Sequence, residues 1–243
     1  MVRLLSVAAT HVGLVRINNE DAYLAVPDVG LFALSDGMGG EAAGEVASKY
    51  FIEEAHAAFI KDAPDPANDM YARVEKIFED ANKRILEHAA QNPDDSGMGC
   101  TAELLTFNKG RYVIGHVGDS RAYLLRRGSL SQLTKDHSLV QLQVDGGLLT
   151  PEEAKKHPRK NIILRALGTD ALMSPDILEG DVLNLDIFLL CSDGLTDMVD
   201  DPAIERILVA AGPLQQKAEG LIGAALDAGG RDNVTVVLCQ VEM

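Results

Sequence analysis

Four aspartates in this sequence stand at the ends of short apolar segments, and three of them adjoin a glycine. Asp36 follows "LFALS", Asp119 follows "VIGHVG", Asp193 follows "IFLLCS", and Asp232 precedes "NVTVVL". Alone, each would be interpreted as a turn residue. Apolar segments of this length are typical of buried strands. A fold that brought the ends of these strands together would place several carboxylates side by side, and they could not all be ionised unless cations were bound between them. Oxygen ligands without nearby histidine or cysteine favour Mg²⁺ or Mn²⁺.

The glycines after Asp36 allow a second ligand, a dinucleotide. The spacing Gly37-x-Gly39-x-x-Ala42 is a loose form of the fingerprint that binds a pyrophosphate at the start of a helix. That interpretation requires the helix to lead into a parallel strand, and it places the charge of Asp36 against the pyrophosphate. The order of the elements must therefore decide between the two ligands.

Hydrophobic periodicity predicts the strands and helices that would position these residues. Strands are expected at 4–10, 22–26, 30–35, 101–107 and 111–117, in a hairpin turning at Gly128-Ser129, at about 181–192, and in "NVTVVLCQV". Helices are expected at 42–60 and 68–90, joined by the loop "DAPDPAND", then in a segment opened by Asp201-Pro202 and at 214–228. One helix leads to a second helix, which counts against the dinucleotide interpretation.

The segment 138–163 has no strong periodicity. It contains a short helix, a Gly146-Gly147 pair that favours mobility, and Thr150-Pro151, which is typical of a helix start with proline at the first helical position.

Composition excludes several classes of protein. The 243 residues carry 37 acidic and 22 basic side chains, a formal charge of −15, which disfavours a nucleic-acid binder. No apolar run is long enough to span a bilayer, and the N-terminal segment makes a poor signal peptide. The three cysteines, at 100, 191 and 239, have no metal-ligand spacing, so reduced thiols in a cytoplasmic protein are expected.

Eight sequence blocks in order resemble one family over essentially the whole chain. They are "RINNEDAY", "LSDGMGG", "GCTA", "VGDSRAY", "LTKDHS", "RALG", "CSDGLTD" and "RDNVTV". The chain resembles the metal-dependent protein serine/threonine phosphatases (type 2C), in particular their bacterial branch. The resemblance implies an α+β fold, an α/β/β/α sandwich of two antiparallel sheets flanked by helix pairs. It also implies a single catalytic domain over 1–243, with a flap at about 138–163 that helps to select substrates.

The resemblance implies a binuclear Mg²⁺ or Mn²⁺ centre. Asp36 matches the aspartate that bridges two tightly bound ions, and Gly37 would offer its carbonyl oxygen to one of them. Asp193 and Asp232 would complete the ligands of the other ion. The two ions would activate a water for direct attack on phosphorus, so no nucleophilic cysteine or serine is needed.

The resemblance assigns four further residues. Glu20 and Asp21 match acids that act on the metals through water, although an isolated acidic pair is usually just solvated. Asp119 matches a ligand of a weaker third ion shared with Asp193; the simpler interpretation is a hairpin turn. Arg16 matches the arginine that binds phosphate with its planar fork, whereas alone it would be a surface charge.

One position departs from part of the family. Some members have a histidine, a proposed general acid, where this chain has Met38. Methionine cannot donate a proton, so water at the metal site or another group must protonate the leaving alkoxide.

The function implied is hydrolysis of phosphoserine and phosphothreonine on proteins, reversing serine/threonine kinase signalling. The expected partners are phosphorylated proteins, including a bacterial kinase and its substrates, and the chain is expected to be a monomer without a membrane segment. Two alternatives remain open: a phosphatase-like module that binds partners without turnover, and a dinucleotide enzyme.

Overall fold

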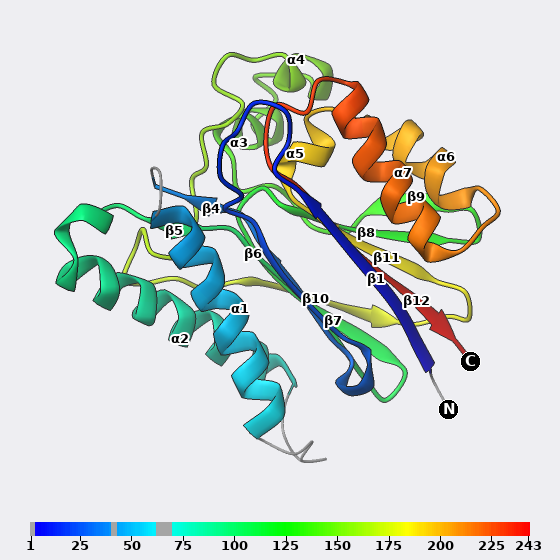
Figure 1. Ribbon diagram of the computed structural model, residues 1–243, viewed down its shortest axis with the longest axis horizontal. Coiled ribbons are helices and arrows are strands. Elements are labelled where there is room, and N and C mark those ends of the chain that lie inside the picture. The colour runs from blue at the N-terminus through cyan, green and yellow to red at the C-terminus, as the bar shows by residue number, and fades with distance from the viewer. Residues whose placement is uncertain (1–2, 40–42, 62–69) are drawn as a thin grey trace.

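The computed structural model describes residues 3–39, 43–61 and 70–243 of the chain. Two five-stranded sheets lie face to face between helices (Figure 1). The first has the order β1 (Arg3–His11), β12 (Val234–Glu242), β11 (Ile187–Cys191), β8 (Arg121–Arg126), β9 (Ser129–Gln132). The second has the order β10 (Asp176–Asp181), β7 (Arg111–Val117), β6 (Ala102–Asn108), β3 (Leu31–Ser35), β2 (Ala22–Val26). A small separate pair joins β4 (Gly37–Met38) to β5 (Gly99–Cys100). All strand pairs in the described part of the chain are antiparallel.

Helix pairs cover the outer faces of both sheets (Figure 1). The second sheet is covered by α1 (Ala43–Lys61) and α2 (Met70–Gln91), and the first by α6 (Asp201–Val209) and α7 (Leu214–Asp227). The shorter elements are η1 (Pro27–Val29), η2 (Pro93–Asp95), α3 (Leu139–Asp145), α4 (Pro151–Lys155) and α5 (Asp193–Thr196). The α/β/β/α sandwich implied by the resemblance is confirmed. None of the helices in the described ranges has the length and apolar character needed to cross a membrane.

Side chains of the central strands alternate between the core that separates the two sheets and the core beneath the helices. In β3, Phe32 and Leu34 pack between the sheets, while Leu31 and Ala33 face α1 and α2. Successive side chains of a strand point to opposite faces of the sheet. A strand that is buried on both faces therefore has a continuous run of apolar residues in its sequence. This is why "LFALS" contains no polar residue before Ser35.

The structure corrects several of the element boundaries that were predicted from the sequence. The strands expected at 181–192 are β10 and β11, separated by a turn in which Leu185 has a φ of 67°. The β8–β9 turn is at Arg127-Gly128, one residue earlier than expected, and both residues have positive φ, as hairpin twist requires. The expected starts of the first two helices, at 42 and 68, and the loop at 62–69 lie outside the described residues, as does Gly40.

Antiparallel register brings the aspartate-bearing strand ends to one end of the sandwich. In the second sheet, the end of β3 lies beside the start of β6, and Ala102 of β6 pairs with Val117 at the end of β7. In the first sheet, Cys191 at the end of β11 pairs with Val236 near the start of β12. The antiparallel order also excludes the strand–helix–parallel strand unit that a dinucleotide fingerprint requires.

Candidate metal centre

One cavity of about 710 Å³ opens at this end of the sandwich. All of the residues singled out from the sequence line it except Asp21. They are Arg16, Glu20, Asp36, Gly37, Asp119, Asp193 and Asp232, joined by Val15, Ile17, Asn18, Met38, Gly39, Asn161, Ile163 and Asn233. The four aspartates at strand ends thus converge, although they come from four separate parts of the chain.

Asp36 is fixed through its backbone. Its N–H donates to Thr101 Oγ1 and its carbonyl accepts from Thr101 N, each at 2.8 Å. The next residue must be glycine, because a Cβ on Gly37 would lie 2.1 Å from the carbonyl oxygen of Gly44 at the start of α1. Gly37 N also donates to the carbonyl of Glu20 at 3.2 Å. The segment expected as a glycine loop is therefore partly a two-residue strand, β4, packed against a helix terminus.

Asp193 and Asp21 each have a buried carboxylate oxygen, Oδ1, with no hydrogen-bond partner in the described part of the chain. The other oxygen of Asp21 accepts from Ser192 Oγ at 2.8 Å, and Ser192 is itself held between the strands by Thr235. Buried polar atoms are normally satisfied, because an unpaired one costs free energy. These two oxygens therefore identify places where a cation or water completes the site.

Burial and mutual repulsion make the ionised forms of these carboxylates unfavourable. Burial, followed by repulsion from Asp21 and the other aspartates, raises the pKa of Asp36 well above its usual value. Burial and repulsion from Asp119 do the same to the pKa of Asp193. Burial raises the pKa of Asp21 to about 6 and that of Asp119 to about 7. Divalent cations would relieve both the burial and the repulsion, so the donor set fits hard metal ions.

The carboxylates do not form a closed cage. Within the described ranges, no group of three His, Cys, Asp or Glu side chains surrounds a single metal position. The acids instead line the cavity wall from separate elements, so backbone oxygens and water would have to complete the coordination of any bound ion. Such an arrangement suits Mg²⁺ or Mn²⁺, since Mg²⁺ commonly keeps several waters in protein sites.

Arg16 lies at the cavity mouth and forms an ion pair with one of these acids. Its Nη2 donates to Asp232 Oδ2 at 2.7 Å, and its side chain is 55% exposed. The Asp232 hydrogen bond is the main cause that raises the pKa of Arg16. The exposed guanidinium is therefore charged and placed beside the acids, where it can meet an incoming anion.

Sequence reasoning missed Asn233, which holds the Arg16 segment in place. Its Nδ2 donates to the carbonyls of Val12 and Asn18 at 3.0 and 2.9 Å, and its Oδ1 accepts from Glu20 N at 2.8 Å. The signal was its place in "RDNVTV", between an aspartate and an apolar strand. Its role depends on a loop more than 200 residues earlier in the chain, which no local pattern reports.

Asp119 does not lie in a hairpin, contrary to the simpler interpretation of its sequence. It lies where the chain crosses from β7 in one sheet to β8 in the other, and it is buried. The preceding Gly118 has a φ of 113°, and a Cβ there would lie 2.6 Å from Thr101 Cγ2. Thr101 Oγ1 also hydrogen-bonds Ser120 Oγ at 2.8 Å, which links this crossover to Asp36.

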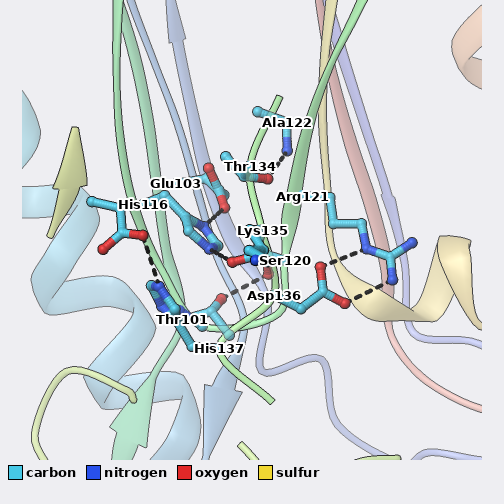
Figure 2. Close-up of polar contacts among 12 residues, drawn as sticks. Thr101, Glu103, His116, Ser120, Arg121, Ala122, Thr134, Lys135, Asp136 and His137 are labelled. Atoms are coloured by element: carbon cyan, nitrogen blue, oxygen red, sulfur yellow. Dashed lines mark hydrogen bonds and ion pairs between the residues drawn. The ribbon is translucent and has the colours of Figure 1, made fainter. Parts of the chain in front are cut away.

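Residues 134–137 support the crossover from its other side (Figure 2). Arg121 donates to both carboxylate oxygens of Asp136 at 2.8 and 2.7 Å. The fully buried pair Glu103–His116 reaches the same segment, because His116 Nε2 donates to the carbonyl of Lys135 at 2.9 Å (Figure 2). This network explains the "LTKDHS" block as support for the Asp119 crossover.

Both ends of the segment at 138–163 are attached next to His137. His137 exchanges hydrogen bonds with Gly118, and the His137 carbonyl accepts from Leu164 N at 2.7 Å. Thr150 caps α4 through a capping box with Glu153, with Pro151 at the first turn, as the sequence predicts. Asn161 and Ile163, which the sequence did not mark, bring the end of the segment to the cavity.

The cysteines take no part in the cavity. All three are buried and free of disulfides, and burial raises the pKa of the Cys100 thiol to about 12. The nucleophilic form of cysteine is the thiolate, and a protonated thiol is a poor nucleophile. The three cysteines therefore serve as core residues, as expected.

Comparison with known proteins agrees with the geometry. The family model described as protein phosphatase 2C matches residues 14–219. The chain is 44% identical over 229 residues to the serine/threonine protein phosphatase PstP of Mycobacterium tuberculosis, covering 94% of this chain and 43% of PstP. It is 38% identical over 235 residues to the serine/threonine phosphatase stp of Listeria welshimeri, covering 95% of this chain and 93% of that protein.

A solved structure shares the fold. The crystal structure of the catalytic domain of PstP in complex with two manganese ions superposes with a TM-score of 0.91 at 40% identity, covering 100% of both chains. This chain thus spans less than half the length of full PstP but matches the whole of its catalytic domain. With most of its length matched by the family model and its strand-end acids gathered in one cavity, this chain belongs to the protein phosphatase 2C family.

Proposed function

We propose that this protein hydrolyses phosphoserine and phosphothreonine on proteins, with residues 1–243 forming one catalytic domain. The observation that carries the proposal is the convergence of Asp36, Asp193 and Asp232 with Arg16 in one open cavity. Relatives of similar sequence are named serine/threonine phosphatases, and one is solved with two manganese ions.

Asp36, the Gly37 carbonyl, Asp193 and Asp232 would hold two Mn²⁺ or Mg²⁺ ions. The unpartnered Oδ1 of Asp193 supports this assignment. Glu20 and Asp21 would act through water: Glu20 lines the cavity, whereas Asp21 lies behind it and is oriented by Ser192. When bound, the two ions supply a water acidified for attack and neutralise the phosphate oxygens.

The chain's own residues position the phosphate. Arg16 would grip two phosphate oxygens, and its bond to Asp232 holds the guanidinium at the cavity mouth before substrate arrives. Met38 lines the cavity but has no proton to donate. The proton for the leaving alkoxide must therefore come from water or from another group in the cavity.

The direct test is phosphate release from a phosphothreonine peptide in the presence of Mn²⁺, with the matching phosphotyrosine peptide as a control. We expect turnover of the phosphothreonine peptide. Binding of the peptide without phosphate release would instead support a binding module. A saturable NADH fluorescence titration would revive the dinucleotide enzyme, which the antiparallel sheets disfavour.

The substrates we infer are phosphorylated proteins, including those modified by a bacterial serine/threonine kinase and the kinase itself. The acidic cavity and the formal charge of −15 support phosphoproteins over nucleic acid. We also propose that the protein is a cytoplasmic monomer, because its three buried cysteines form no disulfide and all the cavity acids come from one copy of the chain.

Arg16→Ala should mainly raise KM for phosphopeptides, and Arg16→Lys should restore it only in part. A lysine cannot reproduce the two parallel contacts of a guanidinium. Initial rates over a range of phosphopeptide concentrations would measure the effect. Arg3→Ala is a matched control, because Arg3 is also exposed and paired with an acid, Glu242, but lies outside the cavity. An unchanged KM in Arg16→Ala would make Arg16 a surface charge.

Asp119→Ala should reduce phosphopeptide turnover more than p-nitrophenyl phosphate turnover. Asp119 would hold a weaker third ion and, with it, the water that protonates the leaving group. An alkoxide needs that proton more than nitrophenolate does. Calorimetry should still detect two Mn²⁺ ions, because the other aspartates remain. Equal losses on both substrates would refute the proton-delivery role, and unchanged kinetics would leave Asp119 as a structural residue of the crossover.

A further inference from the structure

Three exposed apolar side chains flank Arg16 along the chain, and two of them lie at the cavity. Leu14 is 64% exposed, Val15 67% and Ile17 92%. Val15 and Ile17 line the cavity itself, and Ile163 contributes an apolar side chain from the end of the 138–163 segment. Most large apolar side chains are buried, so a cluster of exposed ones at a cavity mouth marks a surface for binding.

The segment is held firmly in this exposed position. Asn233 bonds the carbonyls at both of its ends, Val12 and Asn18, and Leu14 N donates to the Gly230 carbonyl at 2.7 Å. Gly13 has a φ of 83°, and a Cβ there would lie 2.3 Å from the carbonyl oxygen of Asp232. The apolar side chains are thus presented at a fixed distance from the acids, which lowers the entropic cost of binding a partner.

The charges of the cavity do not by themselves select the neighbours of the phosphorylated residue. Its described lining contains five acids, Glu20, Asp36, Asp119, Asp193 and Asp232, and a single cationic side chain, Arg16. Two divalent ions would offset most of the negative charge of these acids, so the lining outside the metal site decides which neighbouring side chains bind. The apolar surface beside Arg16 favours aliphatic side chains at the same place.

We propose that Val15 and Ile17 form an apolar lip that binds aliphatic side chains of the substrate located two residues from the phosphorylated residue. In an extended peptide, side chains two positions apart point to the same face and lie about 7 Å from each other. A phosphothreonine directed at Arg16 therefore directs its second neighbours at the lip. This proposal rests on the phosphatase function proposed above.

The test compares peptides that differ only at positions −2 and +2 from phosphothreonine, with Leu, Ser, Asp or Lys at both. Wild type should show a kcat/KM for the Leu peptide roughly fivefold above that for the Ser peptide, mainly through KM, because partial burial of an aliphatic side chain contributes about that much. In the double variant Val15→Ser/Ile17→Ser this ratio should fall to about one. Leu172→Ser is the matched control, because Leu172 is also 92% exposed but does not line the cavity, and it should keep the wild-type ratio.

Three outcomes would overturn the lip: no preference for Leu in wild type, a preference that survives in the double variant, or a preference for Lys that the double variant retains. Fluorescence anisotropy with the same phosphopeptides separates this proposal from the proposed function. If no peptide or p-nitrophenyl phosphate is hydrolysed with Mn²⁺, the phosphatase function fails. Tighter binding of the Leu peptide that depends on Val15 and Ile17 would then still support the lip, and equal binding of all peptides would refute it.

Discussion

Asp193→Asn is expected to reduce phosphopeptide turnover by at least about 100-fold, since residues that only support metal ligands already contribute about 10- to 100-fold. Asparagine has nearly the same shape but no negative charge to bind a cation. Asp193 is the first residue of α5 and follows the buried strand β11 after one residue, so the local fold should persist. Initial rates with Mn²⁺ and a circular dichroism spectrum would measure the two effects. If the variant kept more than about a tenth of the wild-type rate, Asp193 would not be a metal ligand.

The same variant should make the metal-free protein more stable. Burial and neighbouring aspartates raise the pKa of Asp193 well above its usual value, so its charge destabilises the folded state at neutral pH. A neutral amide removes that penalty. Thermal unfolding should show a higher Tm than wild type in chelator and a smaller increase when Mn²⁺ is added.

Two variants serve as comparisons for Asp193→Asn. Asp181→Asn should change neither measurement, because Asp181 is 82% exposed and lies outside the cavity. Asp232→Asn should also abolish turnover, but it should not raise the Tm as much, because it loses the ion pair with Arg16.

Chelation is expected to remove activity completely, and added Mn²⁺ or Mg²⁺ should restore it. The cavity acids supply only hard oxygen ligands, and the described lining of the cavity contains no thiol or other nucleophile that could replace the ions. Phosphate release would be measured in excess EDTA and again after back-titration with Mn²⁺. Turnover that is unchanged in EDTA would refute the metal mechanism.

Chelation should also make stability depend on pH. The pKa values of Asp21 and Asp119 are raised to about 6 and 7, and that of Asp36 is raised well above its usual value. The folded protein therefore binds protons more tightly than the unfolded chain, whose aspartates titrate near 4. Stability in EDTA should fall as the pH rises from about 5 to 8, and saturating Mn²⁺ should offset most of that fall. A Tm that is flat across this range in EDTA would contradict the burial and mutual repulsion that raise the pKa values of these acids.

The positions of Asp36, Asp119, Asp193 and Asp232 could be predicted from the sequence because each depends on a local event. An apolar strand ends just before the carboxylate or, for Asp232, begins just after it. Antiparallel register then determines which tips meet. The same local signals predicted the helix pairs and the α4 cap.

Contacts between distant segments could not be predicted. Glu20 and Asp21 are neighbours, yet only Glu20 lines the cavity, because Ser192 holds Asp21 behind it. Asn233 and Ile163 act through segments that are far away in the chain. The crossover at Asp119 resembled a hairpin because the sequence does not indicate that β7 and β8 belong to different sheets.

The pairing of β1 with β12 imposes an order on biosynthesis. β1 is the first strand of the described residues, and its partner over all nine residues is the last strand described. At ordinary translation rates they are separated by roughly 10 to 50 seconds. During this interval the nascent first sheet has an unpaired strand that invites aggregation, which makes chaperone protection valuable. Because Asp232 emerges only just before β12, a nascent chain from which β12 has not yet emerged cannot present the complete phosphate site to its substrates.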